Sequence, residues 1–225
     1  MSVAWKKIQQ ELVNLYSQDR REILLMVSGG PDSMFMLDFC NNAGIGFTVC
    51  HFQHGIRDND YLDKELIQQF IQDKQIQCNF VVGYGKDLKD SSNLEAEARS
   101  QRWEFVRNYR KTLGKEVVAV TAHHLNDNIE QVFLDLMRGA AHSNLGLAKF
   151  RFDESLEFFK CKPFLTVPKS VILEQCNRRG IPFIDDITNQ DNHHERNWLR
   201  NEIIPQLMSR RNLEKSMLNA LIHNY

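Results

Sequence analysis

The sequence predicts an α/β protein built on a doubly wound parallel sheet with a small helical C-terminal appendage. Short apolar runs rich in strand-forming residues, typical of buried parallel strands, lie at 23–27, 47–52, 77–82 and 117–121. Helical patterns with one apolar face separate them, at 60–73, 94–113 and 129–137. Strands that alternate with helices form parallel sheets, and ligands bind beyond the carboxyl ends of such strands. The loops that follow strands are therefore the places to look for function.

Residues near the ends of several predicted helices indicate where those helices begin or end. The helix at 94–113 opens with a capping box, Ser92-x-x-Glu95, and stops at Gly114. After residue 139 the pattern is irregular, with a strand expected at 156–160 and helices at 167–179, ended by Gly180, and at 193–208, limited by Pro205. We expect residues 1–150 to form the α/β domain and residues 151–225 a helical segment packed on it.

Composition is that of an ordinary globular protein: 225 residues, 42% hydrophobic and 25% charged. No stretch approaches the ~18 apolar residues of a membrane helix, and the amphipathic start has no signal-peptide core. We therefore expect a cytoplasmic protein without a membrane partner. The net charge of −1 splits into −3 over residues 1–161 and +2 over 162–225, so an RNA partner would meet a local patch.

The chain has five cysteines and no CxxC pair: Cys40, Cys50, Cys78, Cys161 and Cys176. Their wide spacing predicts reduced, mostly buried thiols. It does not support a zinc ribbon or an iron–sulfur site.

A glycine-rich turn follows the first predicted strand directly. It consists of Ser28, Gly29, Gly30, Pro31, Asp32 and Ser33. Two glycines let backbone N–H groups approach an anion, and a proline suits the first position of a helix whose N-terminus attracts negative charge. The turn is not a Walker A loop, because the Lys-Ser/Thr ending is absent. It predicts a phosphate cradle, with a plain strand-to-helix turn as the alternative.

Two histidines and two carboxylates follow the strand at 117–121. They are His123, His124, Asp127 and Glu130. Asp127 and Glu130 are three residues apart and share one helix face, so they suit magnesium or an amino group. These residues could instead bind zinc. The alternative without a ligand is a capped helix whose polar face is exposed to solvent.

Two further segments are weaker taken alone. Arg99 and Arg102 share a helix face beside Trp103, which suits phosphate but also fits an exposed, salt-bridged helix. The loop His-Phe-Gln-His-Gly-Ile-Arg at 51–57 follows the second strand, where nucleotides bind, and a turn at Gly55 explains it equally well.

Together these segments resemble the tRNA(Ile)-lysidine synthetases, a family of N-type ATP pyrophosphatases with the PP-loop fold. SGGPDS matches the family's pyrophosphate loop, and HFQHGIRDND, EAEARSQRWEF and TAHHLNDNIEQVFLDLMRGAAHSNLGL are similar to its later motifs. KPFL and DDITNQDNHHERNWLRNEIIPQL complete the resemblance. It runs from about residue 23 to residue 207 and covers the family's catalytic domain only.

The resemblance implies an ATP-dependent ligase that joins L-lysine to C2 of the wobble cytidine of tRNA(Ile) with a CAU anticodon. The reaction passes through an adenylated tRNA and releases AMP and pyrophosphate. ATP would lie on residues 28–33, Mg²⁺ on Asp32 and Asp127, and lysine on Asp127 and Glu130. The catalytic set would be Asp32, Arg99, His123, Asp127 and Glu130. Arg196 and Arg200 would contact tRNA phosphates, and a homodimer is compatible with the sequence.

The chain also departs from the family pattern. Asn126 stands where the family usually has an aspartate, and Lys162 replaces an arginine; Asn128, Gln131 and Ala141 differ as well. Two other readings therefore stay open. One is another PP-loop ATP pyrophosphatase that modifies tRNA or forms amides. The other is a non-catalytic module that binds ATP or tRNA.

Overall fold

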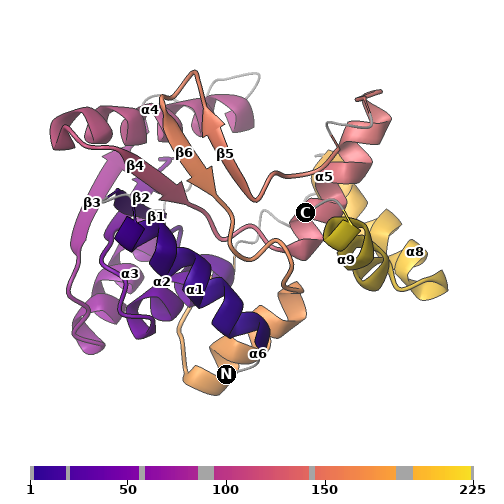
Figure 1. Cartoon of the computed structure of the whole chain (residues 1–225), viewed down its shortest axis with the longest axis horizontal. Coiled ribbons are helices and arrows are strands. Elements are labelled where there is room, and N and C mark those ends of the chain that lie inside the picture. The colour runs from indigo at the N-terminus through magenta and orange to yellow at the C-terminus, as the bar shows by residue number, and fades with distance from the viewer. Residues whose placement is uncertain are drawn as a thin grey trace.

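A six-stranded sheet with strand order β3-β2-β1-β4-β6-β5 forms the centre of the computed structural model. The structure describes residues 3–18, 21–55, 59–85, 94–141, 145–185 and 195–223. All neighbouring strands are parallel except β5 and β6, which are antiparallel. The predicted doubly wound parallel sheet is confirmed (Figure 1).

The four strands predicted in the first half of the chain are all present. The strands are β1 Glu22–Met26, β2 Thr48–Gln53, β3 Asn79–Tyr84, β4 Val117–Val120, β5 Phe150–Asp153 and β6 Phe158–Cys161. The strand expected at 156–160 lies slightly later, as β6, and β5 was not predicted. In β5 the two phenylalanines alternate with charged side chains over four residues, too short a pattern to separate from a loop.

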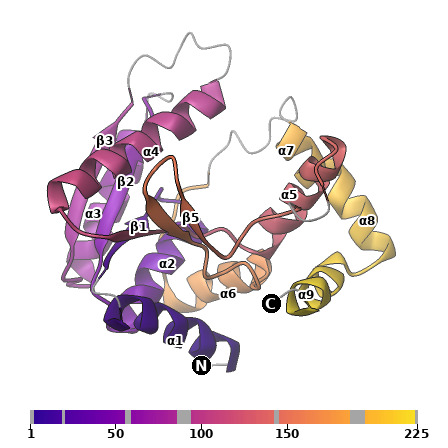
Figure 2. The same cartoon turned by 45° about the horizontal axis from the view of Figure 1, so that its top comes forward.

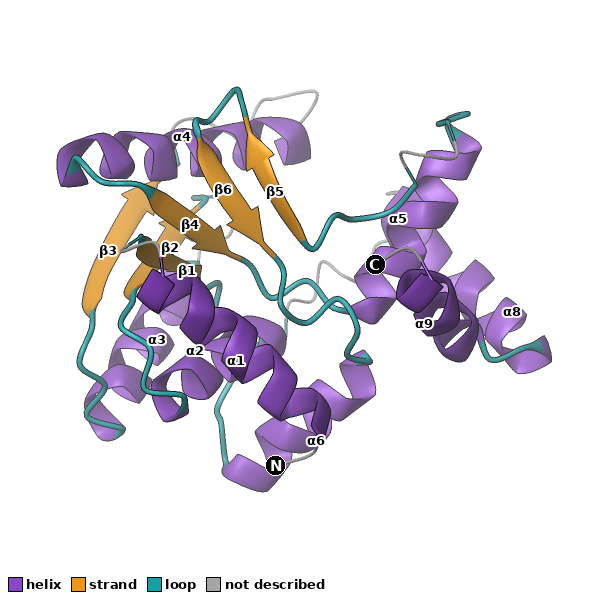
Figure 3. Cartoon of the chain, in the orientation of Figure 1, coloured by secondary structure: helices purple, strands orange, loops and turns teal. Residues whose placement is uncertain are grey.

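Helices flank the sheet and extend beyond it (Figure 3). They are α1 Val3–Gln18, α2 Pro31–Asn42, α3 Tyr61–Asp73, α4 Leu94–Leu113, α5 Leu125–Met137, α6 Lys169–Arg179, α7 Glu195–Trp198, α8 Ile204–Arg210 and α9 Leu213–His223. Gly180 ends α6 with a left-handed φ of 60°, as predicted. The capping box at Ser92 lies outside the described residues. Within the part of the chain that the structure describes, no helix combines the length and apolarity needed to cross a membrane.

Alternating strand side chains divide the core into two layers. On β1, Ile23 and Leu25 point into a cluster shared with α1, α2, α3 and α6, whereas Leu24 points into a smaller cluster with Trp103 and Val106 of α4. Strands buried on both faces explain why these runs are continuously apolar. The two-sided burial fixes the sheet as the rigid base of the ligand-binding edge.

The β5–β6 hairpin completes the sheet, because β6 pairs with β4 at Val118 and Phe159. The domain boundary expected after residue 150 therefore falls at the first residue of β5. Beyond the hairpin, α6 packs against α2. The last helices pack instead against α5, around Ile129, Leu199 and Ile204 (Figure 2).

The helix expected at 193–208 does not stop at Pro205. Its described part runs from Glu195 to Arg210 through a π-helical turn, Leu199–Ile203, placed just before the proline. Proline has no N–H to donate to the carbonyl four residues earlier, so the α-helical hydrogen bond to that carbonyl is missing in any case. A wider, π-helical turn placed before the proline therefore does not sacrifice that bond. Helix α9 was not predicted.

Candidate functional site

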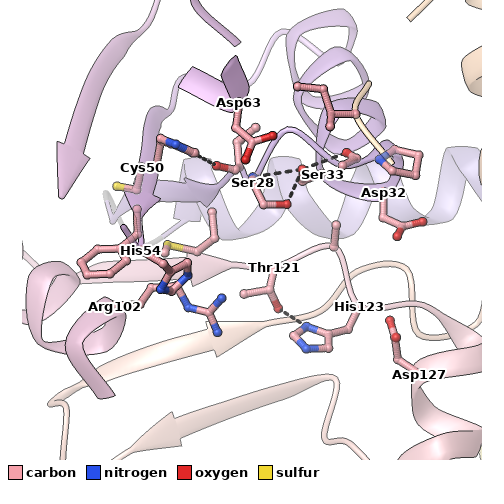
Figure 4. Close-up of a pocket in the computed structure, with 18 of the residues that line it drawn as sticks. Ser28, Asp32, Ser33, Cys50, His54, Asp63, Arg102, Thr121, His123 and Asp127 are labelled. Carbon is pink, nitrogen blue, oxygen red and sulfur yellow. Dashed lines mark hydrogen bonds between the residues drawn. The ribbon is translucent and has the colours of Figure 1, made fainter. Parts of the chain in front are cut away.

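A cavity of about 430 Å³ lies at the carboxyl ends of β1, β2 and β4. The chain proceeds from β1 to β2 on one side and later places β4 on the other side of β1. This is a topological switch point, where open α/β sheets bind their ligands. The turn after β1, the end of β2 and the turn after β4 all line the cavity (Figure 4). The predicted location of the site is thus where the structure has a cavity.

The turn after β1 is shaped to receive an anion. Gly29 has a φ of +90°, and a Cβ there would lie 3.0 Å from an oxygen of Asp63. Ser33 Oγ donates to the carbonyl of Gly30 at 3.0 Å and accepts from the N–H of Ser28 at 3.1 Å. Pro31 begins α2, and the first residues of this helix, Pro31 to Ser33, line the cavity, where a helix N-terminus favours an anion.

Asp32 stands at the start of α2 with one carboxylate oxygen available. Its Oδ1 is buried and has no hydrogen-bond partner. Its Oδ2 lies 3.4 Å from Lys169 Nζ and 3.6 Å from His124 Nε2. A buried carboxylate oxygen without a donor is costly unless a ligand satisfies it. The arrangement suits a cation held between Asp32 and a phosphate.

His123 is an uncharged polar group at the far wall of the cavity. Its Nδ1 lies 2.8 Å from Thr121 Oγ1. Burial, helped by the nearby cations Lys162, Arg99 and Arg102 and opposed by the charge of Asp127, lowers the pKa of His123 to about 4. Near neutral pH its ring is therefore neutral and can donate or accept one hydrogen bond without bringing charge.

His124 and Asp127 cap α5 reciprocally. The N–H of Asp127 donates to His124 Nδ1 at 3.3 Å, and the N–H of His124 donates to Asp127 Oδ2 at 2.9 Å. Because Nδ1 accepts this hydrogen bond, the ring proton is assigned to Nε2. Nε2 lies near the carboxylates of Asp32 and Asp127. Burial raises the pKa of Asp127, but His124, including the hydrogen bond from its backbone N–H, and Arg200 outweigh it, so the carboxyl stays ionised.

Glu130 and Arg200 are joined across the fold. Arg200 Nε donates to Glu130 Oε1 at 2.6 Å and its Nη2 to Oε2 at 2.8 Å, and Nη2 also lies 3.4 Å from Asp127. Glu130 is only 2% exposed, and of the two expected lysine ligands only Asp127 lines the cavity. Arg196 donates to Gln131 at 2.7 Å. Arg200, expected to contact tRNA, is thus held on carboxylates here.

Arg99 and Arg102 of α4 line different hollows. Arg102 lines the cavity together with His54, whereas Arg99 lines a neighbouring hollow that reaches His123 from the other side. At the end of β2, His51 Nδ1 bonds to the carbonyl of Val27 at 2.9 Å, and burial lowers its pKa. Residues 56 and 57, the last two of this motif, lie outside the described residues.

Several lining residues were not singled out by sequence reasoning. They are Asp60, Asp63, Lys169 and Asp185. The two aspartates stand at the start of α3, and this position after β2 was the signal available for them. Lys169 and Asp185 come from distant parts of the chain, and no local pattern marks them.

Asn126, where the family usually has aspartate, bridges three elements. Its Oδ1 accepts from the backbone N–H of Lys169 at 2.9 Å, and its Nδ2 donates to Glu214 of α9 at 3.0 Å. A carboxylate could take the first bond but would face Glu214 with like charge. The amide therefore fits the position that α9 creates.

The fit to a divalent cation is limited in the described part of the chain. No group of three or more His, Cys, Asp and Glu side chains converges there. Magnesium usually binds to one or two carboxylates together with substrate phosphates and water. Asp32 and Asp127, both in the cavity, match that pattern and do not match a closed zinc site.

Comparisons with known proteins agree with this geometry. Residues 4–207 match a family model described as a PP-loop domain. The tRNA(Ile)-lysidine synthase of Chlamydia caviae is 30% identical over 191 residues, covering 84% of this chain and 58% of that protein. The enzyme of the same name from a Thermotoga species is 32% identical over 194 residues, covering 84% of this chain and 45% of that protein.

Among solved structures, the fold is similar to the U34-tRNA thiolase NcsA of Methanococcus maripaludis. The TM-score is 0.75 at 13% identity, covering 96% of this chain and 76% of that one. The chain spans 41–58% of the length of the first two relatives of curated function, those of Chlamydia caviae and Enterococcus faecalis. Since one family model accounts for residues 4–207, the protein belongs to the PP-loop domain family.

Proposed function

We propose that the protein is a tRNA(Ile)-lysidine synthetase, which uses ATP to join L-lysine to C2 of the wobble cytidine of a tRNA(Ile) with a CAU anticodon. One observation carries the proposal. The anion-binding turn at 28–33 shares a single cavity with His123, Asp127 and Arg200, which belong to the motifs that resemble this family. The lysidine synthases of 28–32% identity support the same substrate pair.

The proposed reaction has two balanced steps. First, the C2 oxygen of cytidine attacks the α-phosphorus of ATP, and pyrophosphate leaves onto the cradle of Ser28 and Ser33 and the N-terminus of α2. Second, the ε-ammonium of lysine loses one proton to solvent, the resulting amine attacks C2 and loses another proton to solvent, and AMP leaves with the former C2 oxygen. The cradle stabilises the charge that develops on the leaving pyrophosphate, and preorganised donors of this kind are a major source of rate.

The remaining residues have separate roles in this proposal. Asp127, ionised and in the cavity, receives the cationic amine of lysine, while Glu130 holds Arg200 in place against it. Arg99 and Arg102 neutralise phosphate charge, and neutral His123 offers a hydrogen bond near the reacting cytidine. Arg196 approaches the tRNA from the rim of the neighbouring hollow.

Magnesium would be held by Asp32 and Asp127 and would neutralise charge on the phosphates of ATP. The buried, unpaired Oδ1 of Asp32 supports this assignment. We place the protein in the cytoplasm, where tRNA, ATP and lysine are present and where free thiols like its five cysteines persist.

The test is a complete reaction with the 225-residue chain, ATP, labelled lysine and a tRNA(Ile) transcript. Mass spectrometry of the digested tRNA should show lysidine, with AMP and pyrophosphate formed in equal amounts. Asp32→Asn should lower turnover by about 100-fold, as loss of one preorganised electrostatic group does. Asp73→Asn, on the exposed end of α3, is the matched control and should keep full activity.

Three outcomes contradict the proposal in different ways. AMP formation without lysine in the tRNA would indicate another ATP pyrophosphatase of this family. Absence of any ATP turnover would indicate a binding module. Full activity of Asp32→Asn would show that the cavity at this turn does not hold the nucleotide.

A further inference from the structure

A second hollow, of about 700 Å³, opens beside the first cavity and meets it at His123. Residues of α4, of the β5–β6 hairpin, and of α5 and α7 line it. Figure 2 shows the hairpin with α4 on one side and α5 and α7 on the other. Six cationic side chains line it: Arg99, Arg138, Arg151, Lys160, Lys162 and Arg196. Among the described residues, Asp153 and Glu195 are the acidic side chains of the same lining.

The carboxylates of the lining are already engaged. Asp153 accepts from Lys160 at 2.7 Å, and Glu195 lies 3.3 Å from Arg138. Lys162 donates to the backbone carbonyl of Ala148 at 3.1 Å, a neutral acceptor. The lining therefore keeps an excess of positive charge, which Arg151 and Lys162 carry on its hairpin side.

The crowding of these cations has a measurable consequence. Burial, followed by the charge of Lys160 with smaller contributions from Arg99 and Arg151, lowers the pKa of Lys162 to about 8. Like charges held together destabilise the folded protein. A bound anion would remove that repulsion, so the hollow is organised for negative charge.

The anion is distinct from the nucleotide of the first cavity. The turn at 28–33 does not line the second hollow, whereas Arg151, Asp153 and Lys160 of the hairpin do. A nucleoside whose base enters the first cavity near His123 carries its flanking phosphates just outside that cavity. The second hollow is the adjoining surface with the charge to receive them.

We propose that the second hollow binds phosphodiester groups of the RNA strand next to the nucleoside that enters the first cavity, with Arg151 and Lys162 as phosphate contacts. The inference rests on the RNA substrate of the proposed function, but its test requires binding only. Contacts to phosphates position an RNA without reading its sequence. The hairpin thus sets how deeply the target nucleoside can reach.

The experiment measures binding of a labelled RNA stem-loop with a CAU anticodon over a range of salt concentrations. The variant is Arg151→Gln with Lys162→Gln. Loss of two phosphate contacts should weaken binding about 25-fold at ~0.1 M salt and reduce the slope of log K against log salt by about 1.4–1.8. ATP affinity, measured separately, should be unchanged.

The matched control removes two exposed cations of α1, Lys6→Gln with Lys7→Gln, which lie on the opposite face of the sheet from α4. Its RNA affinity should change by less than about twofold, as expected for charges outside the contact surface. Circular dichroism verifies that both variants are folded.

Each outcome separates this inference from the proposed function. Unchanged RNA affinity in Arg151→Gln with Lys162→Gln overturns the site, even where the wild-type chain forms lysidine. Loss of ATP affinity in that variant, or no RNA binding by the wild-type chain, also overturns it. The expected loss of RNA affinity without any lysidine formation by the wild-type chain supports the site and rejects the proposed function.

Discussion

Glu130 is a buried charge that depends on one partner. It is 2% exposed, and Arg200 supplies two of its hydrogen bonds. Arg200→Gln leaves the carboxylate buried with only Arg196 nearby, at 3.6 Å, and should lower the free energy of unfolding by about 3 kcal/mol. Glu130→Gln should lower it by about 1 kcal/mol, because Arg200 keeps solvent and Asp127 as partners. Urea denaturation of the two variants measures the difference, and equal losses would contradict it.

Lys162 is a cation that the fold disfavours. Its pKa is about 8 in the folded protein against 10.5 as the ordinary value, so the unfolded chain holds this proton more tightly. The full penalty acts below about pH 8 and is released as pH rises towards 10.5. Lys162→Met should therefore raise the free energy of unfolding by about 1–3 kcal/mol at pH 7.

The advantage of Lys162→Met should shrink between about pH 8 and pH 10.5, which denaturation at several pH values would show. A constant advantage, or a loss of stability at neutral pH, would contradict the assignment. The same charge is the one we infer to bind RNA phosphate, so stability and RNA affinity should move in opposite directions. At Lys162, the charge that we infer to bind RNA therefore lowers the stability of the folded protein.

At the scale of elements, the contact of β3 with α4 depends on Gly83. A Cβ at this position would lie 2.6 Å from Phe105 of α4 and 2.7 Å from Phe52 of β2. Gly83→Ala should separate the helix from the sheet and lower the free energy of unfolding by about 1–3 kcal/mol. Adding Phe105→Leu should restore part of the loss, because the contact that is too close is removed. A neutral Gly83→Ala would contradict the packing.

At the scale of the whole molecule, the five thiols report on global unfolding. Cys40, Cys50, Cys161 and Cys176 are buried in the core, and burial raises their pKa, to about 12 for Cys50 and Cys161 and about 11 for Cys176. Cys78 is half-buried. A thiol reagent near pH 8 should modify one cysteine in the folded protein and all five in urea.

The rate of modification of the four buried thiols should equal the rate of opening of the core. Saturating ATP should slow it, since a ligand of the folded state stabilises that state. Fast reaction of two or more thiols before unfolding would contradict the packing of the core. Cys78→Ser provides the control, because it should remove the fast phase alone.

The first four strands of the sheet, and the loops where a site is expected, could be predicted from local sequence. Residues 23–27 and 117–120 are continuously apolar because both faces of the sheet are covered, and this pattern can be seen within each segment. The turn at 28–33 is equally local, since its glycine, proline and serine requirements are set within six residues. Such features are predictable because their physical cause lies within one segment.

Which charged side chains meet depends on how distant elements pack together. Arg200 and Glu130 are 70 residues apart, and their pairing follows from the packing of the last helices on α5. The β5–β6 hairpin pairs with β4 through backbone hydrogen bonds, and a pattern of side chains does not predict such pairing. This pairing brings Arg151 and Lys162 towards α4. The strength of an ionic contact depends on the final distance between the two charges, so these ion pairs could not be predicted before the fold was known.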